Sequence, residues 1–430
     1  MPFASLGLNP AIVKAVVSAG YTDPTPVQSA AIPAALAHKD LLVSAQTGTG
    51  KTAAFMLPAL EMLATPSKSS GFGPRMLVLA PTRELALQVT KAAETYGKFM
   101  RRVRVVSILG GMPYPVQNRL LKGHVDIIVA TPGRLLDHMR AGRIDFSRLE
   151  MLVLDEADRM LDMGFIEDIE TVVAATPASR QTLLFSATLD GTVGTLAKKL
   201  TRDAVRVEIS NAQTRHENIE QRLHYADDQR HKMKLVDHYL RGVDVDQAIV
   251  FTSTKRAADE VAVALASQGF AAAALHGDMN QGQRNRTLGN MRRGNVKVLV
   301  ATDVAARGID VQTITHVINF DLPRIAEDYV HRIGRTGRAG RSGIAISLAG
   351  ARDHGQVRQI ERLTTQPIQV HVVPGLEPTV RPQYAHPGKA RPGFGRKPGT
   401  GPRNGARSGG VPGRSAMSRT GSKPNAPRLR

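Results

Sequence analysis

The chain has 430 residues, enough for two or three domains, and 42% of them are hydrophobic, so packed cores are expected. It contains no cysteine, which excludes disulfides, thiolate chemistry and cysteine-bound zinc. The formal net charge of +20 favours a polyanionic partner, and because only 4% of residues are aromatic, we expect nucleic acid held mainly through phosphates and sugars.

Neither a basic-then-apolar leader nor an apolar run long enough to span a bilayer is found, so we expect a soluble, cytoplasmic protein. Anionic membrane is the competing polyanion. The sequence shows no basic amphipathic helix that would lie on one.

The first forty residues combine a short helical pattern at 10–19 with a proline-restricted loop at 20–28. The loop would present Tyr21 and Gln28 on a stiff backbone. A side-chain amide donates and accepts at once, which matches the N6 and N7 atoms of adenine. A loop glutamine satisfied within the protein is the plainer alternative.

A glycine-rich turn, AQTGTGKT at 45–52, lies between an apolar run and a helical pattern, as in a phosphate-binding P-loop. Gly48 and Gly50 would let successive N–H groups face one concavity at the helix N-terminus. Lys51 can reach the β- and γ-phosphates of a nucleotide, and the Thr52 hydroxyl can ligate Mg²⁺. A Gly/Thr-rich surface turn is the alternative.

Short apolar runs then alternate with helical stretches, which predicts an α/β fold with a parallel sheet covered on both faces. Ligands bind such sheets beyond the carboxyl ends of the strands. The runs lie at 76–79, 103–106, 125–129, 151–154 and 182–185. Polar clusters, expected at the same edge as the P-loop, follow them at 80–85, 110–111, 130–134, 155–158 and 186–188.

The apolar pattern lapses at 209–217, which we interpret as a linker between a domain at 1–208 and a second at 218–375. The second series of runs lies at 248–251, 272–275, 298–300, 317–319 and 344–347. Polar clusters follow at 252–254, 276–278 and 301–303. Because this half has no P-loop, we expect it to close over a nucleotide held by the first.

From residue 376 the periodicity stops. The segment 376–430 holds twelve Lys/Arg against one acid, Glu377, amid ten glycines and nine prolines. It cannot bury enough apolar area to fold, so we predict a disordered basic tail. Counterion release along RNA accounts for its sign, and a solvated segment that only aids solubility is the alternative.

Two charged clusters predict phosphoryl transfer. Asp155 would hold Mg²⁺ through water, and Glu156 would orient or deprotonate an attacking water. In the second half, Arg332, Arg335 and Arg338 recur every third residue, and such forks neutralise charge on a transferring γ-phosphoryl group. An exposed acidic turn and an RNA-binding basic helix face are the alternatives. Arginines supplied from the second half would make hydrolysis depend on closure of the two halves.

Taken together, these motifs resemble the DEAD-box family of ATP-dependent RNA helicases from residue 3 to about 350. The matching features are Phe3, the segment ending in Gln28, AQTGTGKT (45–52), PTREL (81–85), Gly110-Gly111, TPGR (131–134), DEAD (155–158), SAT (186–188), Gln281 and Arg284, ATDVAARGID (301–310) and HRIGRTGR (331–338). The family favours alanine at position 45, and Asp23 stands where it normally has a basic residue. The short amino-terminal lead and the basic Gly/Pro/Arg tail resemble the bacterial RhlE-type subgroup.

The resemblance implies two tandem RecA-like domains, with ATP and Mg²⁺ in the cleft and single-stranded RNA across both. Tyr21 would stack on adenine, Gln28 would read its edge and Asp303 would contact ribose. The implied nucleotide contacts are Tyr21, Gln28, Gln46, Thr47, Gly48, Thr49, Gly50, Lys51, Thr52 and Asp303. The implied catalytic residues are Lys51, Asp155, Glu156 and the arginine fingers Arg335 and Arg338, with Thr52 and Asp155 at the metal. Asp158 would bond to Ser186 and Thr188 and so link hydrolysis to the RNA face.

An RNA grip follows from the same edge. Thr131 resembles an N-cap and Pro132 a first helical residue, so free N–H groups would face a phosphate. The implied RNA contacts are Pro81, Thr82, Arg83, Gly110, Gly111, Thr131, Pro132, Gly133, Arg134, Gln281, Arg284 and Thr302. These contacts read the backbone, so little sequence preference is expected, and the family resemblance implies RNA over DNA through 2′-hydroxyls.

Three functions are compatible with these residues. The first is an RNA-stimulated ATPase that unwinds short duplexes locally or remodels ribonucleoproteins. The second is an ATP-gated RNA clamp or remodelling module without significant unwinding, and the third a DNA translocase of the same superfamily. The DEAD and SAT motifs favour RNA. Ribosome assembly, RNA decay and cold adaptation are all compatible pathways.

Overall fold

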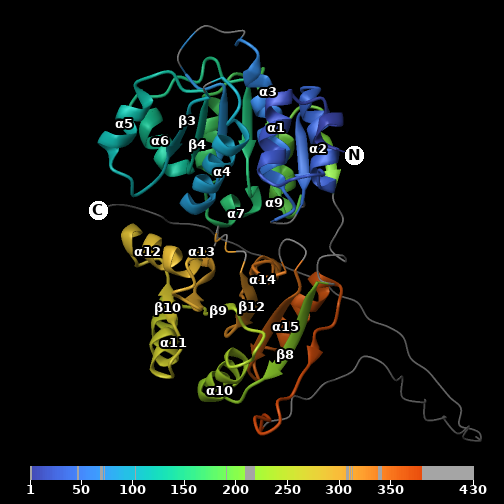
Figure 1. Ribbon diagram of the computed structural model, residues 1–430, viewed down its shortest axis with the longest axis vertical. Helices are drawn as coiled ribbons and strands as arrows, with labels where there is room; N and C mark the ends of the chain where they lie inside the picture. Colours follow the sequence, from blue (N-terminus) through green and yellow to red (C-terminus); the bar gives the residue numbers. More distant parts are fainter. Residues whose placement is uncertain are drawn as a thin grey trace, which may run out of the picture. The chain divides into compact units, whose positions relative to one another are not determined.

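The computed structural model describes residues 2–379 except 46–47, 68–70, 72, 102, 190, 209–217, 307–308, 310, 312 and 338–340. The described residues belong to one compact unit. This unit contains two seven-stranded sheets in which every described strand pair is parallel (Figure 1).

The first sheet has the strand order β3-β4-β2-β5-β6-β1-β7. Its strands are β1 (Leu41–Ser44), β2 (Met76–Leu79), β3 (Val105–Ile108), β4 (Ile127–Ala130), β5 (Met151–Leu154), β6 (Gln181–Ser186) and β7 (Val205–Glu208). The accompanying helices are η1 (Phe3–Leu6), α1 (Pro10–Ser18), α2 (Pro26–Leu36), α3 (Lys51–Ala64), α4 (Arg83–Tyr96), α5 (Tyr114–Leu121), α6 (Pro132–Arg140), α7 (Ala157–Asp162), α8 (Ile166–Ala174) and α9 (Gly191–Leu200).

Successive residues of each central strand enter different cores, because side chains alternate across a sheet. Met76 and Val78 of β2 pack into the core beneath α1–α4, whereas Leu77 and Leu79 pack into the core beneath α6–α9. All four are fully buried. A strand covered on both faces must be apolar throughout, which is why these runs can be recognised in the sequence.

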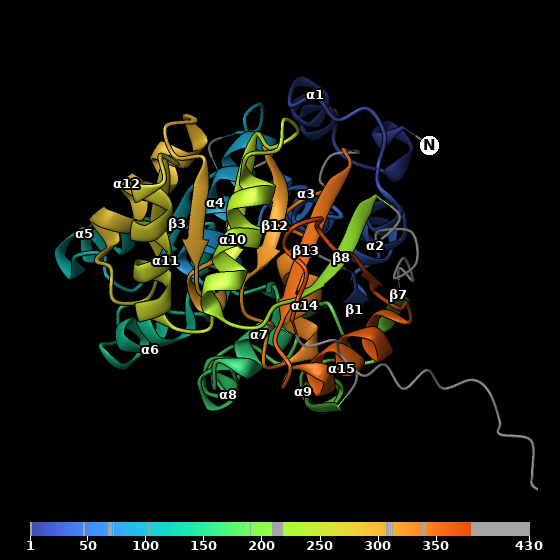
Figure 2. The same ribbon diagram turned by 90° about the horizontal axis from the view of Figure 1, so that it is seen from below.

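The second sheet repeats the arrangement, with the strand order β10-β11-β9-β12-β13-β8-β14. Its strands are β8 (Ile219–Tyr225), β9 (Gln247–Phe251), β10 (Ala272–Leu275), β11 (Val298–Ala301), β12 (Ile314–Asn319), β13 (Gly343–Ala349) and β14 (Gln369–Val370). Its helices are α10 (Gln229–Leu240), α11 (Lys255–Ser267), α12 (Gln281–Arg292), α13 (Asp303–Ala306), α14 (Ala326–Ile333) and α15 (His354–Thr364). Helices α10 and α11 cover one face (Figure 2), and α12 and α13 pack on a core of the other.

The predicted α/β class with two tandem parallel-sheet domains is confirmed. Some strand positions differ from the prediction. The run at 103–106 was expected to be a strand, but β3 begins at Val105 because Arg104 belongs to the preceding loop, where its N–H donates to the Asp126 carboxylate at 2.9 Å. Strands β7, β8 and β14 were not predicted. β7 and β14 lie at the sheet edges and are mostly exposed, so they lack a continuous apolar run.

The segment from Leu376 to Thr379, predicted to open the tail, contacts α10. The Leu376 side chain packs against the core beneath α10, and the His231 ring lies within hydrogen-bond distance of the Leu376 carbonyl at 3.0 Å. The Thr379 N–H donates to the Asp227 carboxylate at 2.9 Å. The predicted linker at 209–217 and the rest of the tail lie outside the described residues. Among the described helices, none is long and apolar enough to cross a membrane.

Candidate nucleotide and RNA site

The P-loop turn joins β1 to α3. Gly48 and Gly50 adopt φ angles of 80° and 91°, in the left-handed region that glycine enters without strain. Helix α3 begins at Lys51, which is buried, so the first turn of a fourteen-residue helix faces the position predicted for phosphates. Thr49 and Thr52 flank this point, whereas Gln46 and Thr47 lie outside the described residues.

Gln28 is tied to the P-loop. Its Oε1 accepts the Thr25 N–H at 2.9 Å in a capping box of α2, and its Nε2 donates to the Gly50 carbonyl at 3.1 Å. A Cβ on Gly50 would lie 2.3 Å from that Nε2, so a larger residue would displace the Gln28 amide as well as strain the φ angle of 91°. Each end of the amide keeps a second hydrogen-bonding position, and the predicted adenine contact stays a prediction. Tyr21 is 50% exposed, with its ring edge-on to Tyr96.

Replacing Gln28 by alanine should weaken ATP binding about tenfold, which corresponds to about 1.4 kcal/mol, because the Gly50 carbonyl of the P-loop loses a hydrogen-bonding partner worth about 1–3 kcal/mol. Titration with ATP and GTP measures the loss, and ATP should suffer more if the amide reads adenine. Gln283→Ala is the matched control, because Gln283 makes the same capping box on α12. Unchanged ATP affinity would contradict the role.

Asp155 follows β5 and is 2% exposed. Burial raises the pKa of its carboxyl to about 7, and the positive charge of Lys51 opposes that rise. Its Oδ1 has no hydrogen-bond partner among the described residues. A buried carboxylate oxygen left open beside an ammonium group fits a divalent cation and phosphates. Within the described ranges no group of three metal-binding side chains occurs, so phosphate oxygens and water would complete such a site.

Glu156 has a φ angle of 53°, a left-handed conformation that costs a non-glycine residue about 1–3 kcal/mol. It stands at the N-cap of α7, and its carboxylate pairs with Arg159 one turn later at 3.3 Å. Both side chains are buried. Sequence reasoning missed Arg159, although its position three residues after Glu156 on a helix was a usable signal.

Asp158 contacts the SAT segment differently from the prediction. Its Oδ2 accepts the backbone N–H of Ala187 at 3.2 Å, and no bond to the side chains of Ser186 or Thr188 is found among the described residues. Ser186 Oγ instead accepts the Thr188 N–H at 3.3 Å. The predicted direct bonds are therefore wrong, because the carboxylate reaches the backbone between the two hydroxyl residues. His331 lies 3.8 Å from the same Oδ2.

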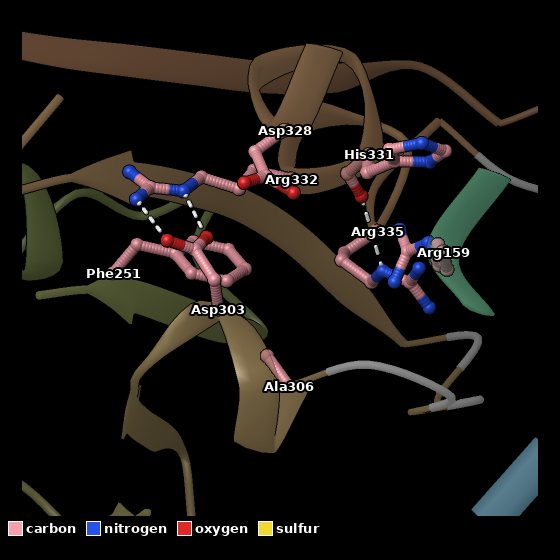
Figure 3. Close-up of a pocket in the computed structure, with 8 residues that line it drawn as sticks. All are labelled: Arg159, Phe251, Asp303, Ala306, Asp328, His331, Arg332 and Arg335. Carbon is pink, nitrogen blue, oxygen red and sulfur yellow. Dashed lines mark hydrogen bonds and ion pairs between the residues drawn. The ribbon is translucent and has the colours of Figure 1, made fainter. Parts of the chain in front are cut away.

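In the second half, Asp303 is paired with Arg332 (Figure 3). Two nitrogens of Arg332 bond the Asp303 carboxylate at 2.5 and 2.7 Å, and the guanidinium lies 4.9 Å from the ring centroid of Phe251. The third nitrogen donates to Asn319 and to the Asp321 carbonyl. Of the three evenly spaced arginines, Arg332 thus serves to fix Asp303. A ribose bound at the predicted position would therefore share the Asp303 carboxylate with Arg332.

Arg335 is 4% exposed and donates to the Ile309 carbonyl at 2.9 Å and to the His331 carbonyl at 3.2 Å. It lines a small pocket together with His331 and with Arg159, the partner of Glu156 (Figure 3). The arginine from the second half is therefore brought to the neighbourhood of the predicted catalytic glutamate. Arg338 lies outside the described residues.

The predicted RNA edge of the first half is assembled from three loops. Pro132 opens α6, and its N-cap Thr131 makes no side-chain cap, so the first N–H groups of α6, near Gly133, are not capped by that side chain. Arg134 donates to the Met112 carbonyl at 2.7 Å. Thr82, beside Pro81, uses its hydroxyl to cap α4.

Arg83 lies against the Gly110-Gly111 turn, since a Cβ on Gly111 would be 2.0 Å from its Nη1. Burial lowers the pKa of Arg83; Arg284 and Arg134 add to that effect and Glu84 opposes it. These neighbouring guanidinium groups form a cationic edge that an anion would relieve.

Arg284 pairs with Glu84 of α4 at 2.9 Å and donates to the Ala305 carbonyl at 3.3 Å. Both charged side chains of the pair are largely buried. Gln281, one turn before on α12, donates to the Asn285 side chain. Thr302 precedes α13, and its carbonyl accepts the Ala305 and Ala306 N–H groups. The role of Glu84, which sequence reasoning missed, is to hold an arginine of the other half.

Comparison with known proteins agrees with this arrangement. Residues 25–196 match the DEAD/DEAH box helicase family, and residues 231–340 match the helicase conserved C-terminal domain. The chain is 43% identical over 381 residues to the ATP-dependent RNA helicase SrmB of Haemophilus influenzae, covering 88% of this chain and 87% of that protein. It belongs to the DEAD-box family of ATP-dependent RNA helicases.

Other similarities of this DEAD-box chain cover nearly the same span. It is 43% identical to the DEAD-box ATP-dependent RNA helicase CshA of Geobacillus kaustophilus, over 89% of this chain and 80% of that protein. Dbp5 of S. cerevisiae bound to RNA and ADP BeF3 is 31% identical with a TM-score of 0.77, over 86% of this chain and 94% of that one. Mss116p bound to ssRNA and AMP-PNP is 28% identical with a TM-score of 0.79, over 87% and 81%.

The family assignment fits the contacts of this DEAD-box protein described above. Lys51, Asp155 and Glu156 follow two strands, β1 and β5, whose carboxyl ends meet at one edge, and Arg335 approaches from the second half. The predicted RhlE-type subgroup and the predicted domain boundaries stay predictions.

Proposed function

We propose that this DEAD-box protein is an ATP-dependent RNA helicase that binds single-stranded RNA with little sequence preference and locally unwinds short duplexes. The observation that carries the proposal is one small pocket lined by residues of both halves. Arg335 of the second half lines it together with Arg159 of the first half, which is paired with Glu156. Relatives that match about nine-tenths of this chain carry the name ATP-dependent RNA helicase, which supports it.

For ATP, Lys51 and the first turn of α3 would bind the phosphates, and Gln28 would hold the P-loop in shape. Thr52 and Asp155 would hold Mg²⁺, which when bound neutralises charge on the β- and γ-phosphates. Glu156, fixed by Arg159, would orient or deprotonate the attacking water. Arg335 and Arg338 would neutralise charge on the transferring phosphoryl group.

For RNA, Arg83, Gly111 and the N-terminus of α6 would grip one stretch of backbone. Gln281, Arg284 and Thr302 would extend the grip onto the second half. Because Arg284 is paired with Glu84, RNA binding there would act on a contact between the halves. Asp158 touches both Ala187 and His331 and so would connect the two sites.

Duplex release tests the proposal against the clamp alternative. A short RNA duplex with a single-stranded overhang is incubated with the protein and either ATP or a non-hydrolysable analogue. We expect ATP to support repeated strand separation, and the analogue to hold RNA without turning over. Binding to RNA with no separation in either condition would leave only the clamp.

The basic tail should contribute a salt-dependent share of RNA affinity. We truncate after Thr379 rather than before Leu376, because Leu376 contacts His231 of α10 and Thr379 bonds Asp227 just before that helix. The removed segment carries twelve Lys/Arg and no acid. Each RNA phosphate that the truncated chain no longer neutralises should flatten the slope of log affinity against log salt by about 0.7, while basal ATP hydrolysis stays unchanged. If the slope of log affinity against log salt did not change, the tail would not contact RNA and would be only a solvated segment.

A cytoplasmic location and ribosomal or decay ribonucleoproteins as targets remain predictions of the sequence. Crosslinking the protein to RNA in cells, followed by sequencing, would identify those targets.

A further inference from the structure

An exposed aromatic ring stands at the end of the cationic edge formed by Arg83 and Arg134. Tyr114 opens α5, three residues after Gly111, and is 41% exposed. Most large apolar or aromatic side chains in this half are buried, and Tyr114 is not needed for its cores. Tyr114 is therefore an exposed aromatic residue next to the arginines predicted to bind RNA phosphates.

The ring of Tyr114 is held in place by a hydrogen bond and by a neighbouring cation. Its hydroxyl donates to the Asp137 carboxylate at 2.6 Å, and the Arg134 guanidinium lies over the ring, 4.1 Å from its centroid. The centroid of the buried His138 ring lies 5.6 Å from that of Tyr114, with the two planes tilted by 49°. A ring fixed by a hydrogen bond, a cation and a packed neighbour is pre-organised, so little rotational entropy would be lost when a ligand stacks on it.

Arg134 connects this ring to the predicted RNA path. It is anchored by the Met112 carbonyl at 2.7 Å and lies 3.6 Å from Asp137. A phosphate bound by Arg134 would therefore place the attached nucleotide next to the Tyr114 ring. Aromatic rings beside a cationic groove bind single-stranded nucleic acid by stacking, whatever the base, because every base has a π-face.

We propose that Tyr114 is a stacking platform for one unpaired nucleobase at the end of the RNA path formed by Arg83, Gly111 and Arg134. This inference rests on the proposed RNA-binding function. It adds a base contact to a grip that otherwise reads only the backbone. It also assigns a role to an aromatic residue in a chain where such residues are scarce.

The test uses single-stranded RNA with 2-aminopurine at one position at a time, bound in the presence of a non-hydrolysable ATP analogue. The chain has no tryptophan, so protein emission is low. We expect wild type and Tyr114→Phe to quench the probe at one position, and Tyr114→Leu to restore its emission and bind RNA about tenfold more weakly. Val263→Ala, an exposed residue of α11, is the control and should change neither readout.

An abasic nucleotide at the quenched position completes a double-mutant cycle. Wild type should then bind as weakly as Tyr114→Leu, with no further loss from combining the two changes. Equal quenching by Tyr114→Leu would overturn the platform. Equal weakening by Tyr114→Leu on intact and abasic RNA would also overturn it, since Tyr114 would then act only by positioning Arg134. A wild-type protein that binds no RNA would instead defeat the proposed function, which is a distinguishable result.

Discussion

Replacing Glu156 by glutamine should lower ATP turnover by about 10²- to 10⁴-fold, the range typical of losing a positioned general base. ATP and RNA binding should be retained, because glutamine keeps the shape of the side chain and Glu156 is not proposed to hold either ligand. Steady-state ATP hydrolysis at saturating RNA measures the loss of turnover. Equilibrium titration with nucleotide and with RNA measures whether binding is retained.

The control for Glu156→Gln concerns Arg159. The substitution leaves the buried Arg159 guanidinium without its charged partner, which can destabilise α7 as well as remove the base. Arg159→Lys disturbs the same pair but keeps the carboxylate. We expect it to retain much more turnover than Glu156→Gln at similar thermal stability. Wild-type hydrolysis in Glu156→Gln would remove Glu156 from its proposed role.

Replacing Arg335 by alanine should lower RNA-stimulated hydrolysis by about 10³-fold or more, because an arginine finger is worth about 10³ to 10⁵ in turnover. The guanidinium also bonds two backbone carbonyls, of Ile309 and His331, so some loss of stability is expected as well. Arg335→Lys keeps the charge without the fork. We expect it to be closer to wild type in stability than in turnover.

Arg256→Ala is the matched control for Arg335, because Arg256 is a solvent-exposed arginine on α11 that pairs only with Glu260 among the described residues. It should leave turnover unchanged. If folded Arg335→Ala hydrolysed ATP within about threefold of wild type, the arginine-finger role would be lost and Arg335 would be a structural residue of the second half.

The central strands could be predicted because burial on both faces forces a continuous apolar run, as in β2 and β5. Edge strands such as β7 could not, because exposure on one side removes that constraint. The P-loop could also be predicted, because its left-handed backbone at Gly48 and Gly50 favours glycine and the two glycines can be recognised in the sequence.

Side-chain partners were harder to predict. Arg332 and Arg335 have the same spacing and charge and line the same pocket, yet Arg332 is paired with Asp303 whereas Arg335 donates to the carbonyls of Ile309 and His331. Asp158 bonds the Ala187 backbone rather than a hydroxyl, because the loop after β6 presents an N–H there. Such choices depend on distances of a few ångströms between segments far apart in the chain, which no local pattern encodes.

The central claim is that two halves of one chain build a reactive site that RNA completes. Steady-state ATP hydrolysis of the full chain, with single-stranded RNA and then DNA of the same sequence titrated in, tests it most directly. We predict that RNA raises the rate at least about tenfold, since an arginine brought to the phosphates on closure is worth more than that, and that DNA raises it much less. A rate that is the same without RNA, or equal stimulation by DNA, would contradict the account.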